Sequence, residues 1–313
     1  MDQRPVLEFL HGAAAGGGRC VLVAVGAVEG SSMRAPGTIM GIAEDGSYEG
    51  SLSGGCIEAA VVAEAFDVLA AGKPRVVRFG AGSPYLDIKL PCGGGLDLAF
   101  HPLRHWDAVE RALASIAVRQ PFSLVASESG LTHEECWQPP HFEPDSPAFA
   151  FGYFPAPLLQ IAGHGAAVEQ LVLLGRTYGC DARVITPDAE IARRLGRRDV
   201  PAALIERTGQ TDLLGGDPWT ATILLFHDHD WEIDLIAAAL DRPHFYLGAM
   251  GGRKAHAFRT EALTARGVSA EAIATIRAPI GLFHSSRDPQ TLALSTLAEV
   301  VRTYHETDFG KVV

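Results

Sequence analysis

The second half of the chain alternates apolar segments of strand length with segments of helical period, and this alternation restricts the fold more than any other feature. Leu158–Ala162 is a short apolar run, and Ala167–Tyr178, which follows it, has apolar residues at helical spacing. Strands that alternate with helices pair in parallel, with helices on both faces of the sheet. The sequence therefore predicts a Rossmann-like doubly wound parallel sheet, a C-terminal α/β domain over residues 155–313. Further strands are predicted at Ala182–Thr186, Thr222–Phe226 and Phe245–Leu247, and helices at Ala189–Leu195, Trp231–Ala239, Ala255–Arg266, Ala270–Ile276 and Pro289–Tyr304.

The first half has a different pattern, in which short strands are separated by glycine-rich turns. Val21–Val28 and Thr38–Ala43 are apolar runs of strand length, and residues 56–71 have helical spacing. We expect an N-terminal α+β domain over residues 1–129, and we expect the polar, proline-bearing residues 130–154 to connect the two domains. Further strands are predicted at Tyr48–Leu52, Arg75–Phe79, Tyr85–Leu90, Leu96–Phe100, Phe122–Ala126 and Ala148–Phe151, and a helix at Trp106–Val118.

The composition is that of a globular protein and restricts its partners. The 313 residues are enough for two domains, and 47% of them are hydrophobic and 20% charged. A net charge of −11 argues against binding nucleic acid through bulk charge. No apolar run is long enough to span a bilayer, and Met1–Pro5 lacks the apolar core of a signal peptide. We therefore expect a cytoplasmic protein without membrane association, whose thiols stay reduced.

The five cysteines are far apart and form no CxxC pair, so they do not indicate a disulfide framework. Cys20 opens an apolar strand and Cys180 lies between a helix and a strand, so both are interpreted as small packing residues. Cys136 lies in a polar stretch that predicts nothing specific. Cys56 and Cys92 differ from these three because each adjoins a run of glycines.

The turn Ser53-Gly54-Gly55-Cys56 precedes a predicted helix and is the main candidate site. Glycine allows a sharp turn and lets a ligand approach the backbone N–H groups. The unpaired N–H groups and the dipole at a helix N-terminus favour an anion, so we expect the pKa of the Cys56 thiol to be lowered. A thiolate there would attack electrophiles, exchange sulfur or ligate a soft metal.

Two further glycine-rich elements carry groups suited to an anion. Successive N–H groups in the Cys92-Gly93-Gly94 turn can form an anion-binding nest, and the Arg34 guanidinium suits a phosphate. A single turn of this kind would only indicate a hairpin. Three in one domain, two with a cysteine and one with an arginine, favour an anion-binding or thiol site.

These segments carry a resemblance to a known family. Val28–Gly37, Gly50–Glu58 and Pro91–Gly94 resemble the N-terminal half of the XdhC/CoxI family, whose members are xanthine dehydrogenase accessory proteins. Phe245–Lys254 and Ala278–Leu282 resemble its C-terminal Rossmann half. The resemblance covers nearly the whole chain, with the motifs in the expected order.

The resemblance implies a non-catalytic chaperone of molybdenum cofactor (molybdopterin). Such proteins bind the cofactor, protect it while its sulfido ligand is installed, and deliver it to an apo molybdenum hydroxylase such as xanthine dehydrogenase. It implies Cys56 as the residue that holds the cofactor, with Cys92 as a second candidate. It also implies an apo molybdenum hydroxylase and a cysteine desulfurase as partners, and we expect a homodimer. A phosphate and a molybdenum centre suit N–H nests, an arginine and a thiolate.

The loop Gly163-His164-Gly165 follows a predicted strand and matches a G-x-G-x-x-V variant of the dinucleotide-binding fingerprint, with Val168 in place of the third glycine. The acid that usually ends the second strand and holds a ribose is replaced by Thr186. An NAD(P)-dependent oxidoreductase is therefore the first alternative function. A Rossmann fold that binds no dinucleotide explains the loop as well, and the sequence leaves open whether it binds pterin phosphate, a nucleotide or nothing.

The run His227-Asp228-His229-Asp230 follows a predicted strand end and supplies the second alternative, a metal-dependent hydrolase. No partner ligands are visible elsewhere, so we predict no metal site. We expect these side chains to line a crevice or cap a helix, with Asp230 at the start of the next helix. An oxidoreductase would need His227 or His284 as its acid–base residue.

Overall fold

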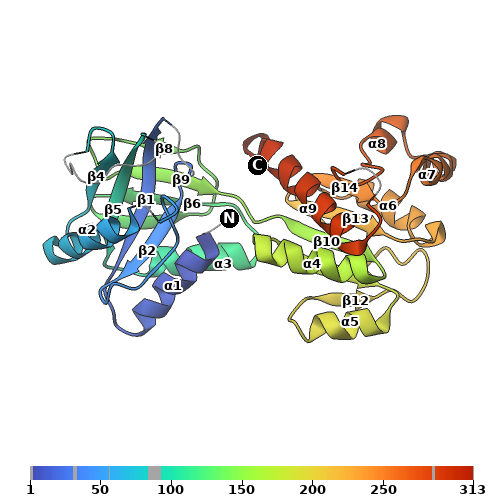
Figure 1. The fold of residues 1–313 in the computed structure, drawn as a ribbon, viewed down its shortest axis with the longest axis horizontal. Helices are drawn as coiled ribbons and strands as arrows, with labels where there is room; N and C mark the ends of the chain where they lie inside the picture. Colours follow the sequence, from blue (N-terminus) through green and yellow to red (C-terminus); the bar gives the residue numbers. More distant parts are fainter. Residues whose placement is uncertain (1–2, 31–33, 56, 84–92, 284–285, 313) are drawn as a thin grey trace. The chain divides into compact units, whose positions relative to one another are not determined.

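The N-terminal unit is built on a five-stranded antiparallel sheet. The computed structural model describes residues 3–30, 34–55, 57–83, 93–283 and 286–312, and the chain folds as two units, 1–155 and 156–313 (Figure 1). The strands of this sheet lie in the order β3-β2-β1-β5-β4. Their bounds are β1 (Cys20–Glu29), β2 (Ile39–Ala43), β3 (Tyr48–Glu49), β4 (Arg75–Gly80) and β5 (Gly95–Leu103).

Both faces of this sheet are covered, which explains why β1 has almost no polar side chains. Val21 and Val23 pack against helix α2 (Glu58–Ala71) on one face. Leu22 and Ala24 pack on the other face against α1 (Gln3–Ala15), α3 (Asp107–Ala117) and a second sheet. The strand therefore appears in the sequence as a continuous apolar run rather than as an alternating one.

The second sheet of this unit corrects the predicted connecting segment. Residues 130–154 do not run as an irregular link, because they supply three strands to a four-stranded antiparallel sheet of order β7-β6-β9-β8. Phe149, Phe151 and Tyr153 alternate into the core on β9, which extends the strand predicted at Ala148–Phe151, whereas β7 and β8 were not predicted. The bounds are β6 (Phe122–Ser127), β7 (Gly130–Glu134), β8 (His141–Phe142) and β9 (Phe149–Tyr153).

The C-terminal unit has the predicted doubly wound parallel sheet. Its strands are paired in parallel in the order β12-β11-β10-β13-β14. The chain passes outward from β10 to β12 and then returns to the other side of β10, so the winding reverses between β10 and β13. Ligands of open α/β sheets bind at such a reversal, beyond the carboxyl ends of the strands. The bounds are β10 (Leu158–Gly163), β11 (Asp181–Thr186), β12 (Ala202–Leu204), β13 (Thr220–Leu225) and β14 (Tyr246–Ala249).

Helices cover both faces of the parallel sheet, as the alternation predicted. Helices α4 (Ala166–Tyr178), α5 (Ala189–Gly196) and α9 (Pro289–Glu306) share one apolar cluster with it. A second apolar cluster contains side chains of α6 (Ile233–Leu240), α7 (Arg253–Ala265) and α8 (Ala270–Ala274). The remaining elements are η1 (His229–Trp231) and η2 (Phe309–Lys311).

Several predicted boundaries differ from the structure. Helix α1 and strand β12 were not predicted from the sequence, and the helix predicted over residues 56–71 begins at Glu58. The predicted strand Tyr85–Leu90 lies outside the described residues.

Candidate functional site

Glu58, the first residue of α2, organises the glycine turn that precedes the helix. Its carboxylate is buried and accepts six hydrogen bonds from this turn, four of them from backbone N–H groups. The donors to Oε1 are Ser51 Oγ (2.9 Å), Leu52 N (3.2 Å) and Ser53 N (3.0 Å), and the donors to Oε2 are Ser53 Oγ (2.7 Å), Gly55 N (2.9 Å) and Ile57 N (3.1 Å).

These hydrogen bonds determine the charge of Glu58. Burial by itself would raise the pKa of the carboxyl, but the bonds from Ser53, Ser51 and Gly55 outweigh burial and lower the pKa to about 2. Glu58 is therefore ionised at neutral pH. The sequence predicts that these N–H groups stabilise the Cys56 thiolate or a bound anion, whereas in the structure four of them donate to the chain's own Glu58.

The backbone of the turn requires its two glycines. Gly54 and Gly55 have φ angles of +80° and +108°, which other residues rarely adopt, and both are exposed. Leu52 and Ile57, on either side, are buried in the core under the sheet. Burial of these two apolar side chains and the hydrogen bonds to Glu58 thus hold the turn in place. Cys56 itself lies outside the described residues.

Arg78 on β4 joins the strand ends from which the other two glycine-rich segments extend. Its Nη1 donates to Asp97 at 3.0 Å, its Nη2 pairs with Glu29, and its Nε donates to the carbonyl of Ala81 at 2.7 Å. A Cβ on Gly95 would lie 2.6 Å from Nη2, so only glycine allows this approach. No sequence pattern indicates Arg78, because its acidic partners lie 49 and 19 residues away along the chain.

The structure brings two of the three predicted segments together. Glu29 pairs with Gly95 across β1 and β5, and a Cβ on Gly30 would lie 3.4 Å from the Cα of Gly94. Gly94 is buried, whereas Gly93 is exposed with a φ of +70°. Cys92 lies outside the described residues.

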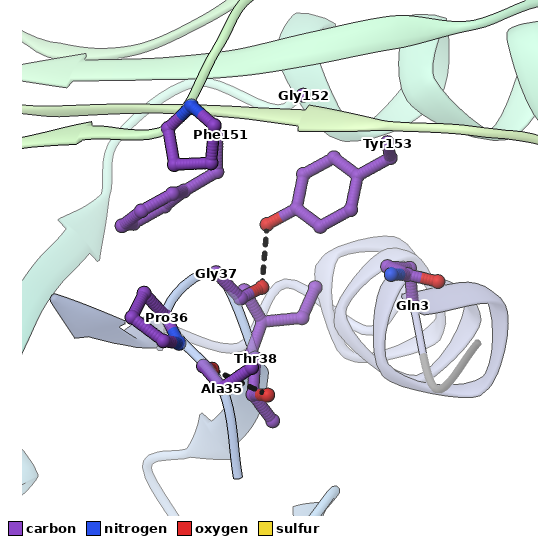
Figure 2. A pocket seen from close by; sticks show the side chains of 10 residues that line it. Gln3, Ala35, Pro36, Gly37, Thr38, Phe151, Gly152 and Tyr153 are labelled. Atoms are coloured by element: carbon purple, nitrogen blue, oxygen red, sulfur yellow. Dashed lines mark hydrogen bonds between the residues drawn. The ribbon is translucent and has the colours of Figure 1, made fainter. Parts of the chain in front are cut away.

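Arg34 is half-buried, and the residues that follow it line a small pocket of about 240 Å³ (Figure 2). Figure 2 shows the hydroxyl of Tyr153 pointing at this segment, where it donates to the carbonyl of Gly37 at 2.9 Å. Gly37 has a φ of +86°, and a Cβ there would lie 3.3 Å from the ring of Phe151. Strand β9, which lies within the predicted connection 130–154, therefore contacts the Arg34–Gly37 segment through Tyr153 and Phe151.

The loop Gly163-His164-Gly165 belongs to the other unit, at the reversal between β10 and β13. A Cβ on Gly163 would lie 2.6 Å from the carbonyl oxygen of Leu225, so the two strands approach too closely for a side chain. Gly165 begins α4 with a φ of +85° and no side-chain cap. The ring of His164 lies 5.7 Å from that of His227, centroid to centroid. The two histidines therefore lie close together beyond the carboxyl ends of β10 and β13.

The position that would hold a ribose offers no free carboxylate. Thr186, at the end of β11, is buried, and its hydroxyl accepts from the N–H of Asp188 at 3.1 Å. Asp188 in turn caps α5, accepting from the N–H groups of Glu190 at 2.9 Å and Ile191 at 3.1 Å. The structure thus supplies a phosphate-sized glycine loop without the acid that dinucleotide sites use.

The His227–Asp230 run is arranged for capping and packing. Asp228, and not the predicted Asp230, caps the following turn by accepting from the N–H of Asp230 at 3.0 Å. His229 Nδ1 lies 2.5 Å from the buried carboxylate of Glu232, which also pairs with the fully buried Arg259 at 2.7 Å. Within the described ranges, no three His, Cys, Asp or Glu side chains are grouped so that they could hold a metal ion. His284, an acid–base candidate, lies outside the described residues.

Cys20 and Cys180 pack in the core, as predicted. Burial raises the pKa of the Cys20 thiol to about 11 and that of the Cys180 thiol to about 12. Cys136 is exposed. Neither buried thiol is available as a thiolate at neutral pH.

Comparison with known proteins places these sites in a family. Residues 13–80 match the model of the XdhC and CoxI family, and residues 159–300 match that of the XdhC Rossmann domain. The chain is 34% identical over 309 residues, 98% of its length and 91% of the relative's, to the molybdenum cofactor insertion chaperone PaoD of Escherichia coli. It is also 23% identical over 279 residues to the uncharacterized protein YqeB of the same organism, of which it spans 40%.

The fold and the candidate sites define a protein whose N-terminal unit carries glycine-rich turns on antiparallel sheets and whose C-terminal unit is a Rossmann-like domain. A solved structure from Bacillus halodurans, described as a xanthine dehydrogenase, has the same fold over 100% of both chains, with a TM-score of 0.78 and 21% identity. The chain belongs to the XdhC and CoxI family. In the part of the chain that the structure describes, none of the helices is both long and apolar enough to cross a bilayer.

Proposed function

We propose that this protein binds molybdenum cofactor, protects it during sulfuration and delivers it to an apo molybdenum hydroxylase such as xanthine dehydrogenase. The observation that carries the proposal is the 34% identity to a molybdenum cofactor insertion chaperone over 98% of the chain. The chain acts in this proposal as a carrier and not as an enzyme. Its further partners would be a cysteine desulfurase and a second copy of the chain, in the cytoplasm.

The chemistry of the N-terminal segments fits this cofactor when the roles are divided among them. The backbone N–H groups around Ser53, Gly54 and Gly55 donate largely to Glu58, so this turn would present the Cys56 thiol and would not hold the phosphate. Arg34, with the Cys92-Gly93-Gly94 segment, would supply the phosphate contacts. The cofactor supplies the molybdenum centre, for which a thiolate is a suitable soft ligand.

The C-terminal loop has a smaller part in the proposal. Gly163, His164 and Gly165 are the cofactor-binding candidates of the C-terminal unit, where the N-terminus of α4 offers a separate place for a phosphate. NAD(P) is not the ligand that we propose, because Asp188, the acid next to Thr186, caps α5.

The test is retention of molybdopterin by the purified protein on gel filtration. We expect the wild-type chain to retain it, Cys56→Ala to lose it, and Cys136→Ala, which removes an exposed thiol of the same unit, to retain it. Failure of the wild-type chain to retain molybdopterin would reject the proposal. Equal retention by Cys56→Ala would reject the role of the cysteine alone.

A further inference from the structure

Helix α7 begins without any anion of its own. Its N-cap is Gly252, which has no side chain, and its first turn contains no acid but two exposed cations, Arg253 and Lys254. The first N–H that closes a helical bond is that of His256, to the carbonyl of Gly252 at 3.1 Å. The N–H groups of Arg253, Lys254 and Ala255 have no acceptor among the described residues.

This arrangement opposes the usual electrostatics of a helix start. Cations at the positive end of the helix dipole are unfavourable, and several other helices of the chain have an acidic side chain at that end instead. At the N-termini of α2, α5 and α9, backbone N–H groups donate to the carboxylates of Glu58, Asp188 and Asp288, respectively. The net charge of the chain is −11, so two adjacent cations at this helix start stand out against an acidic background.

A buried cation lies directly behind this turn. Arg259 is fully buried, and its Nε and Nη2 bind the carboxylate of Glu232 at 2.7 and 3.1 Å. Its Nη1 is also buried but has no partner. Nη2 also donates to the carbonyl of Met250, and a Cβ on Gly251 would lie 3.2 Å from Nη2 and 3.6 Å from Nη1, so the guanidinium, with its unpartnered Nη1, lies against the glycine turn. His256 Nδ1, in the same stretch of α7, is a second buried polar atom without a partner.

We propose that the turn Gly251–Lys254 and the N-terminus of α7 bind a phosphate group, either free or as a monoester. Three N–H groups, two mobile cations and the unpartnered edge of Arg259 match a small dianion. The site lies at the carboxyl end of β14, and the N–H of Met250 bonds to the carbonyl of Leu224 at 2.9 Å, so it adjoins β13 on the edge of the sheet where ligands bind. This proposal does not depend on the proposed function.

The first test measures thermal unfolding of the full chain against inorganic phosphate and glycerol phosphate at constant ionic strength. A ligand that binds only the folded protein raises its unfolding temperature in a saturable way. We expect both probes to do so, and Arg253→Ala/Lys254→Ala to weaken their affinity by about tenfold or more. Arg197→Ala, which removes an exposed arginine from the C-cap of α5, should bind as the wild type does. Tighter binding of glycerol phosphate would identify a monoester as the ligand, and equal binding would identify free phosphate.

The second test places a carboxylate of the chain itself at the N-cap of α7, where the phosphate would bind. Gly252 has φ −81° and ψ −172°, and a Cβ there meets nothing within 4 Å, so Gly252→Asp introduces a cap without a clash. We expect Gly252→Asp to unfold at a higher temperature than the wild type without phosphate, and to lose the response to phosphate. Gly252→Ala should keep that response. The proposal is overturned if neither probe shifts the wild type, if the shift persists in Gly252→Asp, or if the double variant binds phosphate with the affinity of the wild type.

Discussion

Glu58→Gln should destabilise the N-terminal unit more than any other single-atom change in the glycine turn. The carboxylate has a pKa of about 2 in the folded protein, against an ordinary value of 4.5. A difference of that size corresponds to about 3 kcal/mol of stability at pH 7. A glutamine keeps one oxygen acceptor, but in either orientation its NH₂ group would face two backbone N–H donors. Those two donors would lose their hydrogen bonds, and each lost bond costs about 1–3 kcal/mol. The two arguments agree in magnitude.

The pH dependence separates this effect from a general loss of packing. Because folding lowers the pKa of Glu58, its stabilisation is complete above the unfolded pKa and is lost as the pH falls through the folded pKa of about 2. We therefore expect the difference in unfolding free energy between the wild type and Glu58→Gln to shrink from about 3 kcal/mol at pH 7 to about 1.4 kcal/mol at pH 3.

The assay is urea unfolding of both proteins at a series of pH values. Glu8→Gln, which neutralises an exposed acid on α1, is the matched control and should change the unfolding free energy by less than about 0.5 kcal/mol. A difference for Glu58→Gln that stayed constant from pH 7 to pH 3, or one no larger than that of the control, would refute the reasoning.

Three further predictions concern other positions. Gly163→Ala places a Cβ 2.6 Å from the carbonyl of Leu225 and should lower the unfolding free energy of the C-terminal unit by about 1–3 kcal/mol in urea unfolding, whereas no change would show that β13 can yield. Tyr153→Phe removes the hydrogen bond to Gly37 and should cost about 1 kcal/mol by the same measurement, and a gain in stability would contradict it. In native iodoacetamide labelling followed by mass spectrometry, Cys56 should react faster than Cys20 and Cys180, whose burial raises their thiol pKa values to about 11 and about 12, and equal rates would reject an activated thiol at Cys56.

The candidate site could be predicted only in part from the sequence. Glycine allows the positive φ angles that Gly54 and Gly55 adopt, and the N–H groups of this turn meet an anion, Glu58, that differs from the expected thiolate or ligand. The identity of that anion was not predicted, because a glutamate after a glycine turn is equally consistent with an exposed first-turn acid. Only the folded turn shows that it accepts six hydrogen bonds.

Partners that are distant along the chain were missed for the same reason. Arg78 reaches Glu29 across 49 residues, and Tyr153 reaches Gly37 across 116 residues. No local pattern indicates such pairs. The connection expected over residues 130–154 missed strands β7 and β8, because both are short, have few apolar residues and lack buried positions at a period of two.

The sequence by itself determined that the C-terminal half is a doubly wound sheet, because apolar periodicity and glycine turns are local properties of the chain. It also located the glycine-rich segments of the N-terminal half. The tertiary structure alone decided which charges meet: Glu58 with the turn before α2, Arg78 with three strand ends, and Arg259 with Glu232 behind an uncapped helix start. Such pairings depend on distances across the fold, which residue order does not specify.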